Sequence, residues 1–116
     1  MGIIDFVIQE LAIMKQFNES LLDKLGTFAE IPGLSKYKIS DHGFVQNKKS
    51  FKLLYPKAMK DGHEYYLLSD DFGIRRQYPI RFLVAETFIP NEGGLSNVEH
   101  IDGDKTNNEV TNLRRV

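Results

Sequence analysis

The chain has 116 residues, no cysteine and a formal net charge of −1. Its length suits one domain with a modest core, and its 41% hydrophobic and 27% charged residues are ordinary for a globular protein. The absence of cysteine excludes disulfides and thiolate metal sites. The sequence shows neither a bilayer-length apolar run nor a signal-peptide pattern, so we expect a cytoplasmic protein without membrane contact.

Charge is distributed unevenly along the chain. Residues 1–34 carry two Lys and five acidic residues, and residues 82–116 carry three basic and six acidic residues, so each end has a charge of −3. Between them, residues 35–81 hold ten Lys or Arg against five acids, which gives +5. This pattern is typical of a surface that binds a polyanion. A solvated basic face is the alternative interpretation.

The first segment predicts an amphipathic helix from about Ile3 to Leu25. Its apolar residues follow a heptad seam with Asn18 as the polar seam position, and further apolar residues widen the stripe. Gly26 is a natural C-terminal stop. The width of the stripe favours packing against a core, and a homodimer through this helix is the alternative.

A first β-hairpin is predicted over residues 37–45, with its turn at Asp41-His42-Gly43. His42 and His63 both lie beside glycine in predicted turns, and we expect both to be solvated. Three tyrosines are expected in the strand core rather than as platforms for stacked bases: Tyr37, Tyr65 and Tyr66.

A second hairpin is predicted over residues 64–80, with a turn at Asp70–Gly73. The apolar spacing of Arg81–Phe88 predicts a short helix, which Pro90 stops. A short strand is expected over Val98–Ile101, followed by a polar, turn-rich stretch to the end of the chain.

Two parts of the chain resemble known motifs. The stretch EIPGLSKYKISDHGFVQN is similar to the opening of the nuclease-associated modular (NUMOD) domain, whose pattern includes IPG, Y-x-V-S and N-x-G-x-V. The stretches RFLVAETFIPNEGG and VEHIDGDKTNNEVTNLRRV resemble the core of HNH homing endonucleases of the phage and intron type, which follows such a module. Together they cover residues 30–116. The resemblance implies a phage-encoded protein that works in the cytoplasm of a bacterial host.

The resemblance also implies a site for phosphodiester cleavage, which needs a base to deprotonate water and a divalent cation beside the phosphate. His100 matches the family's general base. Glu99 stands where close relatives place an aspartate metal ligand, and the implied cofactor is Mg²⁺ or another divalent metal. Asn112 matches the residue that hydrogen-bonds and orients the catalytic imidazole. The remaining polar matches are turn-forming residues: Asp102, Gly103, Asn107 and Asn108.

Two departures from the family pattern bear on catalysis. The family's second metal ligand lies on a helix beyond the position of Asn112, and this chain stops at Val116. With one carboxylate, Mg²⁺ would be held weakly, mostly by water and phosphate. Arg81-Phe82 replaces the family's His-Arg before LVA. The chain is therefore either a truncated nuclease or a scaffold retained without full catalysis.

Basic side chains of the middle segment are the candidate contacts to double-stranded DNA. Contacts to phosphate give salt-dependent affinity with little base selectivity. A two-stranded ribbon fits the major groove, and Arg75 and Arg76 are the candidates for reaching bases. The phosphate-contacting candidates are Lys36, Lys38, Lys48, Lys49, Lys52, Lys57, Lys60, Arg75 and Arg76.

The expected fold class is α+β: an N-terminal amphipathic helix, a small antiparallel β-hairpin module, a short helix and an incomplete ββα-metal (HNH) motif. The expected division is residues 1–26 for the helix, 27–80 for the NUMOD-like module and 81–116 for the HNH-like motif. The leading function is a DNA-binding protein that nicks DNA with a divalent metal. The alternative is an inactive phage-encoded binding protein, a regulator or an inhibitor of a host defence nuclease, with a host protein as partner.

Overall fold

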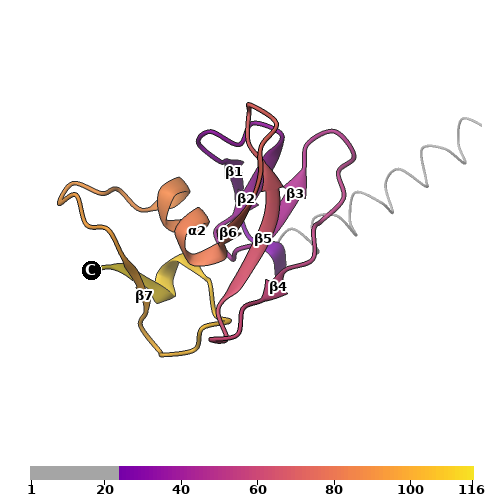
Figure 1. Ribbon diagram of the computed structural model, residues 1–116. Helices are drawn as coiled ribbons and strands as arrows, with labels where there is room; N and C mark the ends of the chain where they lie inside the picture. The colour runs from indigo at the N-terminus through magenta and orange to yellow at the C-terminus, as the bar shows by residue number, and fades with distance from the viewer. Residues whose placement is uncertain (1–23) are drawn as a thin grey trace, which may run out of the picture.

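The computed structural model describes residues 24–116. The predicted amphipathic helix of residues 3–25 lies outside them, apart from its last two positions. The described part is a small α+β fold with two three-stranded antiparallel sheets, an α-helix and a two-stranded pair. Figure 1 shows the helix between the sheets and the final strand pair. Within residues 24–116, no helix has the length and apolar character needed to cross a bilayer.

The first sheet has the order β1-β2-β3 and contains the first predicted hairpin. Strands β2 (Tyr37–Ser40) and β3 (Val45–Asn47) pair antiparallel, as the alternation of apolar residues predicts. Strand β1 (Phe28–Glu30), which was not predicted, pairs with the other edge of β2. Ile39 of β2 is fully buried, so this sheet turns one face to the core.

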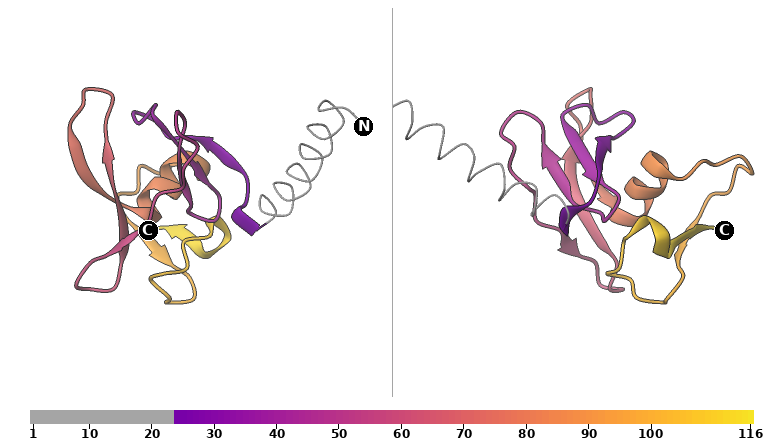
Figure 2. Two further views of the ribbon diagram at one scale, coloured as in Figure 1. Left: turned by 90° about the vertical axis from the view of Figure 1, so that its right-hand side faces the viewer. Right: turned by 180° about the vertical axis from the view of Figure 1, so that it is seen from behind.

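The second sheet has the order β4-β5-β6, with β4 at Lys57–Ala58, β5 at Glu64–Ser69 and β6 at Arg75–Pro79. The predicted second hairpin is confirmed by the antiparallel pairing of β5 with β6. Its turn is closed by Asp70, whose carboxylate accepts hydrogen bonds from the backbone N–H groups of Phe72 and Ile74. The hairpin forms a long ribbon on one side of the molecule (Figure 2).

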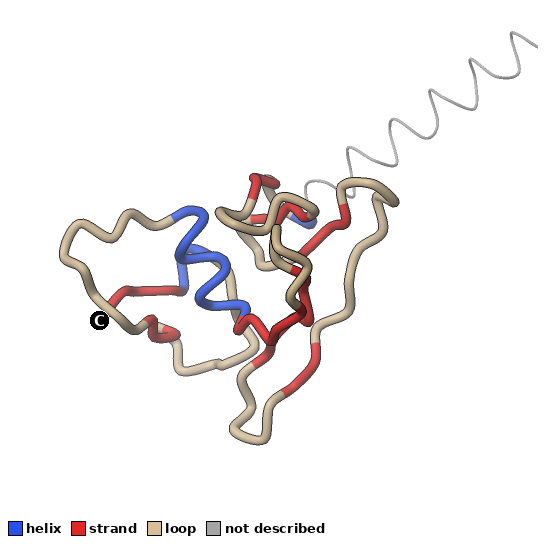
Figure 3. The backbone as a smooth tube through the Cα atoms, turned by 45° about the horizontal axis from the view of Figure 1, so that its top comes forward, coloured by secondary structure: helices blue, strands red, loops and turns tan. Residues whose placement is uncertain are grey.

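Helix α2 (Ile80–Phe88) begins one residue before the predicted start. It contacts β2, β5 and β6, and also the last elements, which are β7 (Val98–His100), the short 3-10 helix η1 (Val110–Asn112) and β8 (Leu113–Arg115). The loop of residues 89–97 swings outward between α2 and β7 (Figure 3). The helix therefore joins the sheets to the final strand pair.

The C-terminal end of α2 is capped from β8. The guanidinium of Arg115 donates hydrogen bonds of 3.0 Å to the carbonyl oxygen of Ala85 and 2.9 Å to that of Ile89. The last carbonyl groups of a helix have no partner within it, and a basic side chain is one way to satisfy them. Arg115 thus fixes the position of β8, and with it the position of β7.

One buried cluster runs through both sheets, α2 and the final strand pair. The tyrosine prediction is confirmed for Tyr37 and Tyr66, which are buried, whereas Tyr65 is partly exposed. The Tyr66 hydroxyl donates to the carbonyl oxygen of Gly43, and burial raises the pKa of Tyr66 to about 12. The cluster comprises Ile31, Leu34, Tyr37, Ile39, Val45, Tyr66, Leu68, Ile80, Leu83, Val84, Ala85, Val98 and Leu113.

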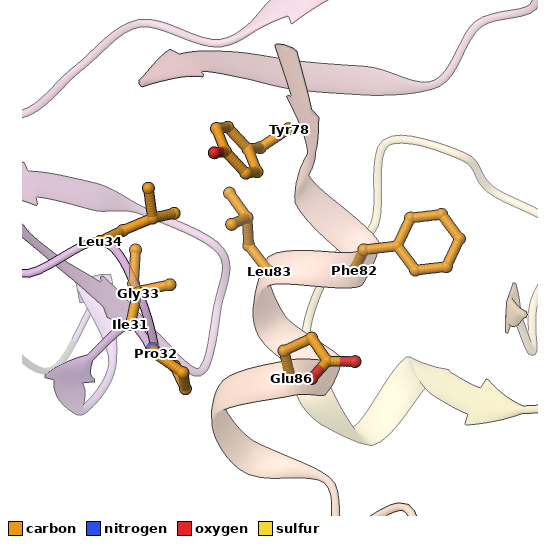
Figure 4. Close-up of a pocket in the computed structure, with 8 residues that line it drawn as sticks. All are labelled: Ile31, Pro32, Gly33, Leu34, Tyr78, Phe82, Leu83 and Glu86. Carbon is orange, nitrogen blue, oxygen red and sulfur yellow. The ribbon is translucent and has the colours of Figure 1, made fainter. Parts of the chain in front are cut away.

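The IPGL motif packs against α2. Ile31 and Leu34 are buried, and their side chains lie opposite Leu83 across a hollow of about 230 Å³ (Figure 4). The lining of this hollow is mainly apolar, with Glu86 at its edge. The contacts of the motif are therefore those of a packing element that attaches the β1–β2 loop to the helix.

Candidate nuclease site

A second hollow, of about 240 Å³, lies beside β7. It brings together residues that are far apart in the sequence, from the β4–β5 turn, the start of α2, β7 and the loop that follows β7. Figure 1 shows this loop next to the β4–β5 turn. The hollow is lined by His63, Arg81, Asn97, Val98, Glu99, His100, Gly103 and Lys105.

His100 is held by an asparagine from the loop after β7. Its Nε2 lies 2.8 Å from Oδ1 of Asn108, and the amide nitrogen of Asn108 faces the carbonyl oxygen of Thr106 at 3.5 Å. With the amide in this orientation, its oxygen accepts a hydrogen bond from Nε2–H of His100. The neutral imidazole therefore keeps the lone pair on Nδ1, the nitrogen that can accept a proton from water.

Asn112 makes a different contact from the one predicted. Its amide nitrogen donates to the Asp102 carboxylate and to the carbonyl oxygen of Asn107, both at 2.9 Å, and its oxygen accepts from the Asp102 N–H. Asn112 thus closes the loop, while Asn108, expected only as a turn residue, contacts the imidazole. Sequence spacing alone does not separate these asparagines, because both follow β7 in the same polar stretch.

Hydrogen bonds within the loop also favour the ionised form of the Asp102 carboxyl group. Asp102 accepts from the Asn107 side chain, the Asp104 N–H and the Asn112 side chain. These bonds, that of Asn107 most of all, lower the pKa of Asp102 below its usual value. The loop therefore keeps its closed shape around an ionised carboxylate.

Glu99, the predicted metal ligand, lies on β7 beside His100 and forms an ion pair with Arg114 of β8. Carboxylate oxygen suits a hard divalent cation, but a protein site for such an ion normally has several oxygen ligands. Within residues 24–116, no group of three or more His, Asp or Glu side chains is close enough to hold a metal ion. The lining of the hollow thus offers one carboxylate, and the described residues do not by themselves fit a complete metal site.

His63 was expected to be solvated, and this prediction is wrong. Its Nδ1 lies 3.0 Å from the Asp61 carboxylate, its backbone N–H donates to the same carboxylate, and its side chain is 18% exposed. The hydrogen bond from His63 is the main reason that the pKa of Asp61 falls to about 2. His42 is also paired rather than free, with Nδ1 3.0 Å from Glu109.

Two cations complete the lining of the hollow, and neither was predicted as a site residue. Arg81 lies at the start of α2, and Lys105 lies in the loop after β7. Nζ of Lys105 donates to the carbonyl oxygen of Asp61 at 2.6 Å. Positive side chains in a hollow beside an imidazole form an environment that favours an anion.

Gly43, in the β2–β3 turn, packs against Asn108, the residue that contacts His100. It has a φ of +91°, and a Cβ there would lie 3.1 Å from Ile80 and 3.2 Å from the Cβ of Asn108. The hairpin turn thus approaches Asn108, the residue that holds His100, so closely that a side chain at position 43 would force its neighbours to shift by a few tenths of an ångström. The positive φ and this close approach together explain in physical terms why glycine occupies the turn.

The predicted DNA contacts lie on strands β2, β4 and β6 and in the turns and loops of the two sheets. Lys48 forms a 2.7 Å ion pair with Glu30, whose pKa it lowers, so this side chain already has a partner. Arg75 and Arg76 are exposed and adjacent on β6, where successive side chains point to opposite faces. Only one of the two can therefore face a given groove. Among the predicted lysine contacts, those that are exposed are Lys36, Lys49, Lys52, Lys57 and Lys60, and Lys38 is partly exposed.

The chain is similar to HNH endonucleases in both sequence and fold. The solved structure of the HNH homing endonuclease I-HmuI, described for its DNA binding and cleavage, matches with a TM-score of 0.69 and 37% identity over 78% of this chain and 52% of that chain. No protein-family model matches.

Two HNH endonucleases of Acanthamoeba polyphaga mimivirus are similar in sequence. One is 38% identical over 79 residues, which are 68% of this chain and 24% of the relative. The other is 32% identical over 105 residues, which are 89% of this chain and 26% of the relative. The chain thus spans about a quarter of the length of these viral proteins.

Proposed function

We propose that this chain is an HNH-type DNA-binding protein whose hollow beside β7 takes a phosphodiester for nicking. The observation that carries the proposal is His100, fixed through Nε2 by Asn108 in a hollow that also holds Arg81 and Lys105. An oriented neutral imidazole beside cations is suited to hydrolysis of an anionic ester.

The proposed reaction begins when Nδ1 of His100 takes a proton from a water molecule. The water oxygen then forms a bond to phosphorus, the bond from phosphorus to the leaving sugar oxygen breaks, and that oxygen takes a proton from solvent. Arg81 and Lys105 stabilise the negative charge that develops on the phosphate oxygens. General base catalysis of this kind contributes about 10²–10⁴-fold to a rate.

A divalent metal is part of the proposed function but not of the steps above. Glu99 is the residue that would contact it, and the other ligands would be water and substrate phosphate. Arg114 competes for the same carboxylate, because the two side chains form an ion pair. When bound, such an ion would neutralise charge on the phosphate.

The exposed basic side chains between Lys36 and Arg76 are proposed to bind the flanking duplex. We expect duplex affinity, measured by gel shift in EDTA, to fall steeply from about 50 to about 200 mM salt. Lys52→Ala should weaken binding more than Lys48→Ala, because Lys52 is exposed whereas Lys48 is paired with Glu30. Affinity that is independent of salt, or equal losses in the two variants, would contradict this surface.

Binding without cleavage is a second candidate function. The ion pair of Glu99 with Arg114 favours it, because that pair occupies the carboxylate nearest His100 in sequence. Supercoiled plasmid incubated with Mg²⁺, with Mn²⁺ and with EDTA separates the two candidates. Nicking in metal and not in EDTA supports the nuclease, whereas retained gel shift without nicking in any buffer supports the binding protein.

A further inference from the structure

The candidate site contains a second imidazole that the proposed reaction does not use. The rings of His63 and His100 face the same hollow, with centroids 5.5 Å apart and planes inclined by 32°. His63 comes from the β4–β5 turn and His100 from β7, so the two lie together only in the folded chain.

Asp61 fixes the orientation of His63. One carboxylate oxygen accepts from the backbone N–H of His63, and the other lies 3.0 Å from Nδ1. A carboxylate that accepts a hydrogen bond from Nδ1–H selects which ring nitrogen remains for other contacts. Nε2 of His63 is therefore the nitrogen available to a ligand.

The turn itself is fixed against the loop after β7. Lys105 donates from Nζ to the Asp61 carbonyl oxygen, and Gly62, with a φ of +92°, packs in van der Waals range of the Lys105 side chain. The position of His63 thus depends on contacts that join the two sides of the hollow.

We propose that His63 binds, as an imidazolium, the DNA phosphate on which His100 acts. Nδ1–H then donates to Asp61 and Nε2–H donates to a phosphate oxygen, with Arg81 and Lys105 as the other contacts. This inference rests on the proposed function. The composition of the hollow favours an anion, because two cations and two imidazoles line it and its one carboxylate, that of Glu99, is paired with Arg114. Asp61 acts through His63 and is a positioning residue.

Dimethyl phosphate, a monoanionic phosphodiester, tests the site without DNA. The chain has three histidines, so its imidazole NMR spectrum holds three sets of signals, and His42, which pairs with Glu109, is an internal control. We expect the signals of His63 and His100 to shift with one common saturation curve while that of His42 stays. A His63 signal that does not move, or that moves with Mg²⁺ alone, overturns the proposal.

Nicking by substituted chains separates this inference from the proposed function. We expect His63→Ala to lower the nicking rate by about tenfold or more, His63→Gln to recover part of it through its amide N–H, and His42→Ala to match the wild type. Asp61→Asn should change the ¹⁵N signature of the His63 tautomer. If wild type and His63→Ala nick equally, the inference fails and the function stands. If the wild type neither binds nor nicks, the function fails.

Discussion

At the scale of single residues, two asparagines of the loop after β7 have separate tasks. Asn108 touches the imidazole of His100, whereas Asn112 joins Asp102 to the carbonyl oxygen of Asn107. The first contact orients the proposed general base, and the second maintains the shape of the loop. These tasks predict different consequences of substitution.

We expect Asn108→Ala to lower nicking by about 10²-fold, because a base displaced by about 1 Å loses activity on that scale. Asn112→Ala should instead lower the free energy of unfolding by about 1–3 kcal/mol, because it leaves polar groups of the loop without partners. Thermal melts and plasmid nicking on both variants check this. Loss of activity in Asn112→Ala with an unchanged melt, and normal activity in Asn108→Ala, would reverse the assignment.

The ionisation of Asp61 reports on its hydrogen bond with His63 in the β4–β5 turn. Its folded pKa is about 2 against an ordinary 3.8, so its contribution to stability is present above pH 3.8 and is lost as the pH falls through 2. We expect the Asp61 carboxyl ¹³C signal to titrate near pH 2 in the wild type. In His63→Ala the midpoint should rise towards 3.8, because the main hydrogen bond is gone. An unchanged midpoint would show that His63 is not the partner.

At the scale of elements, the β2–β3 turn and the loop after β7 meet at Gly43. Its positive φ requires glycine, its carbonyl oxygen accepts from Tyr66, and its Cα faces Asn108. The first hairpin therefore supports the candidate site although none of its side chains enters the hollow.

Gly43→Ala combines backbone strain with this close approach. We expect the strain alone to cost about 1–2 kcal/mol, and the contact with Asn108 and Ile80 to add to it. Gly73→Ala is the matched control, because Gly73 has a similar φ of +83° and no atom within 4 Å of its would-be Cβ. Chemical denaturation of both variants measures the difference. Equal losses of stability would mean that the close approach has no energetic consequence.

The sequence predicts the elements in which a regular apolar spacing or a turn motif extends over many residues. Strands β5 and β6 alternate along a ribbon closed by Asp70, and α2 carries a helical apolar spacing before Pro90. Strands β1, β4 and β8 have two or three residues each, too few to show periodicity. Strands β3 and β7 are equally short, but a predicted hairpin turn marks β3 and the Glu99-His100 motif marks β7. The pairing of β1, β4 and β8 depends on partners that only the folded chain provides.

The candidate site was predicted only where the motif is contiguous. Glu99 and His100 are neighbours in β7, so the sequence alone is enough to show their resemblance to an HNH motif. His63 and Arg81 reach the same hollow from distant parts of the chain. An Asp-Gly-His turn is an ordinary surface pattern. The pairing of Asp61 with His63 two residues later was the one local signal that could have indicated a held imidazole.

At the scale of the whole molecule, the near-neutral charge conceals a separation of charge. The segment 35–81 carries +5 and supplies most of the exposed lysines, while the segment after it carries −3. The buried cluster joins the two segments through α2. A basic surface and a hollow with an oriented imidazole thus belong to one packed unit, as binding and nicking of one duplex would require.

The most direct test is the rate at which supercoiled plasmid is nicked in Mg²⁺ by the wild type, His100→Ala and His42→Ala. We predict that His100→Ala lowers the rate by about 10²–10⁴-fold with unchanged duplex affinity in a gel shift, and that His42→Ala resembles the wild type. If His100→Ala nicks as fast as the wild type, His100 is not the base, and the proposed function of the hollow is contradicted.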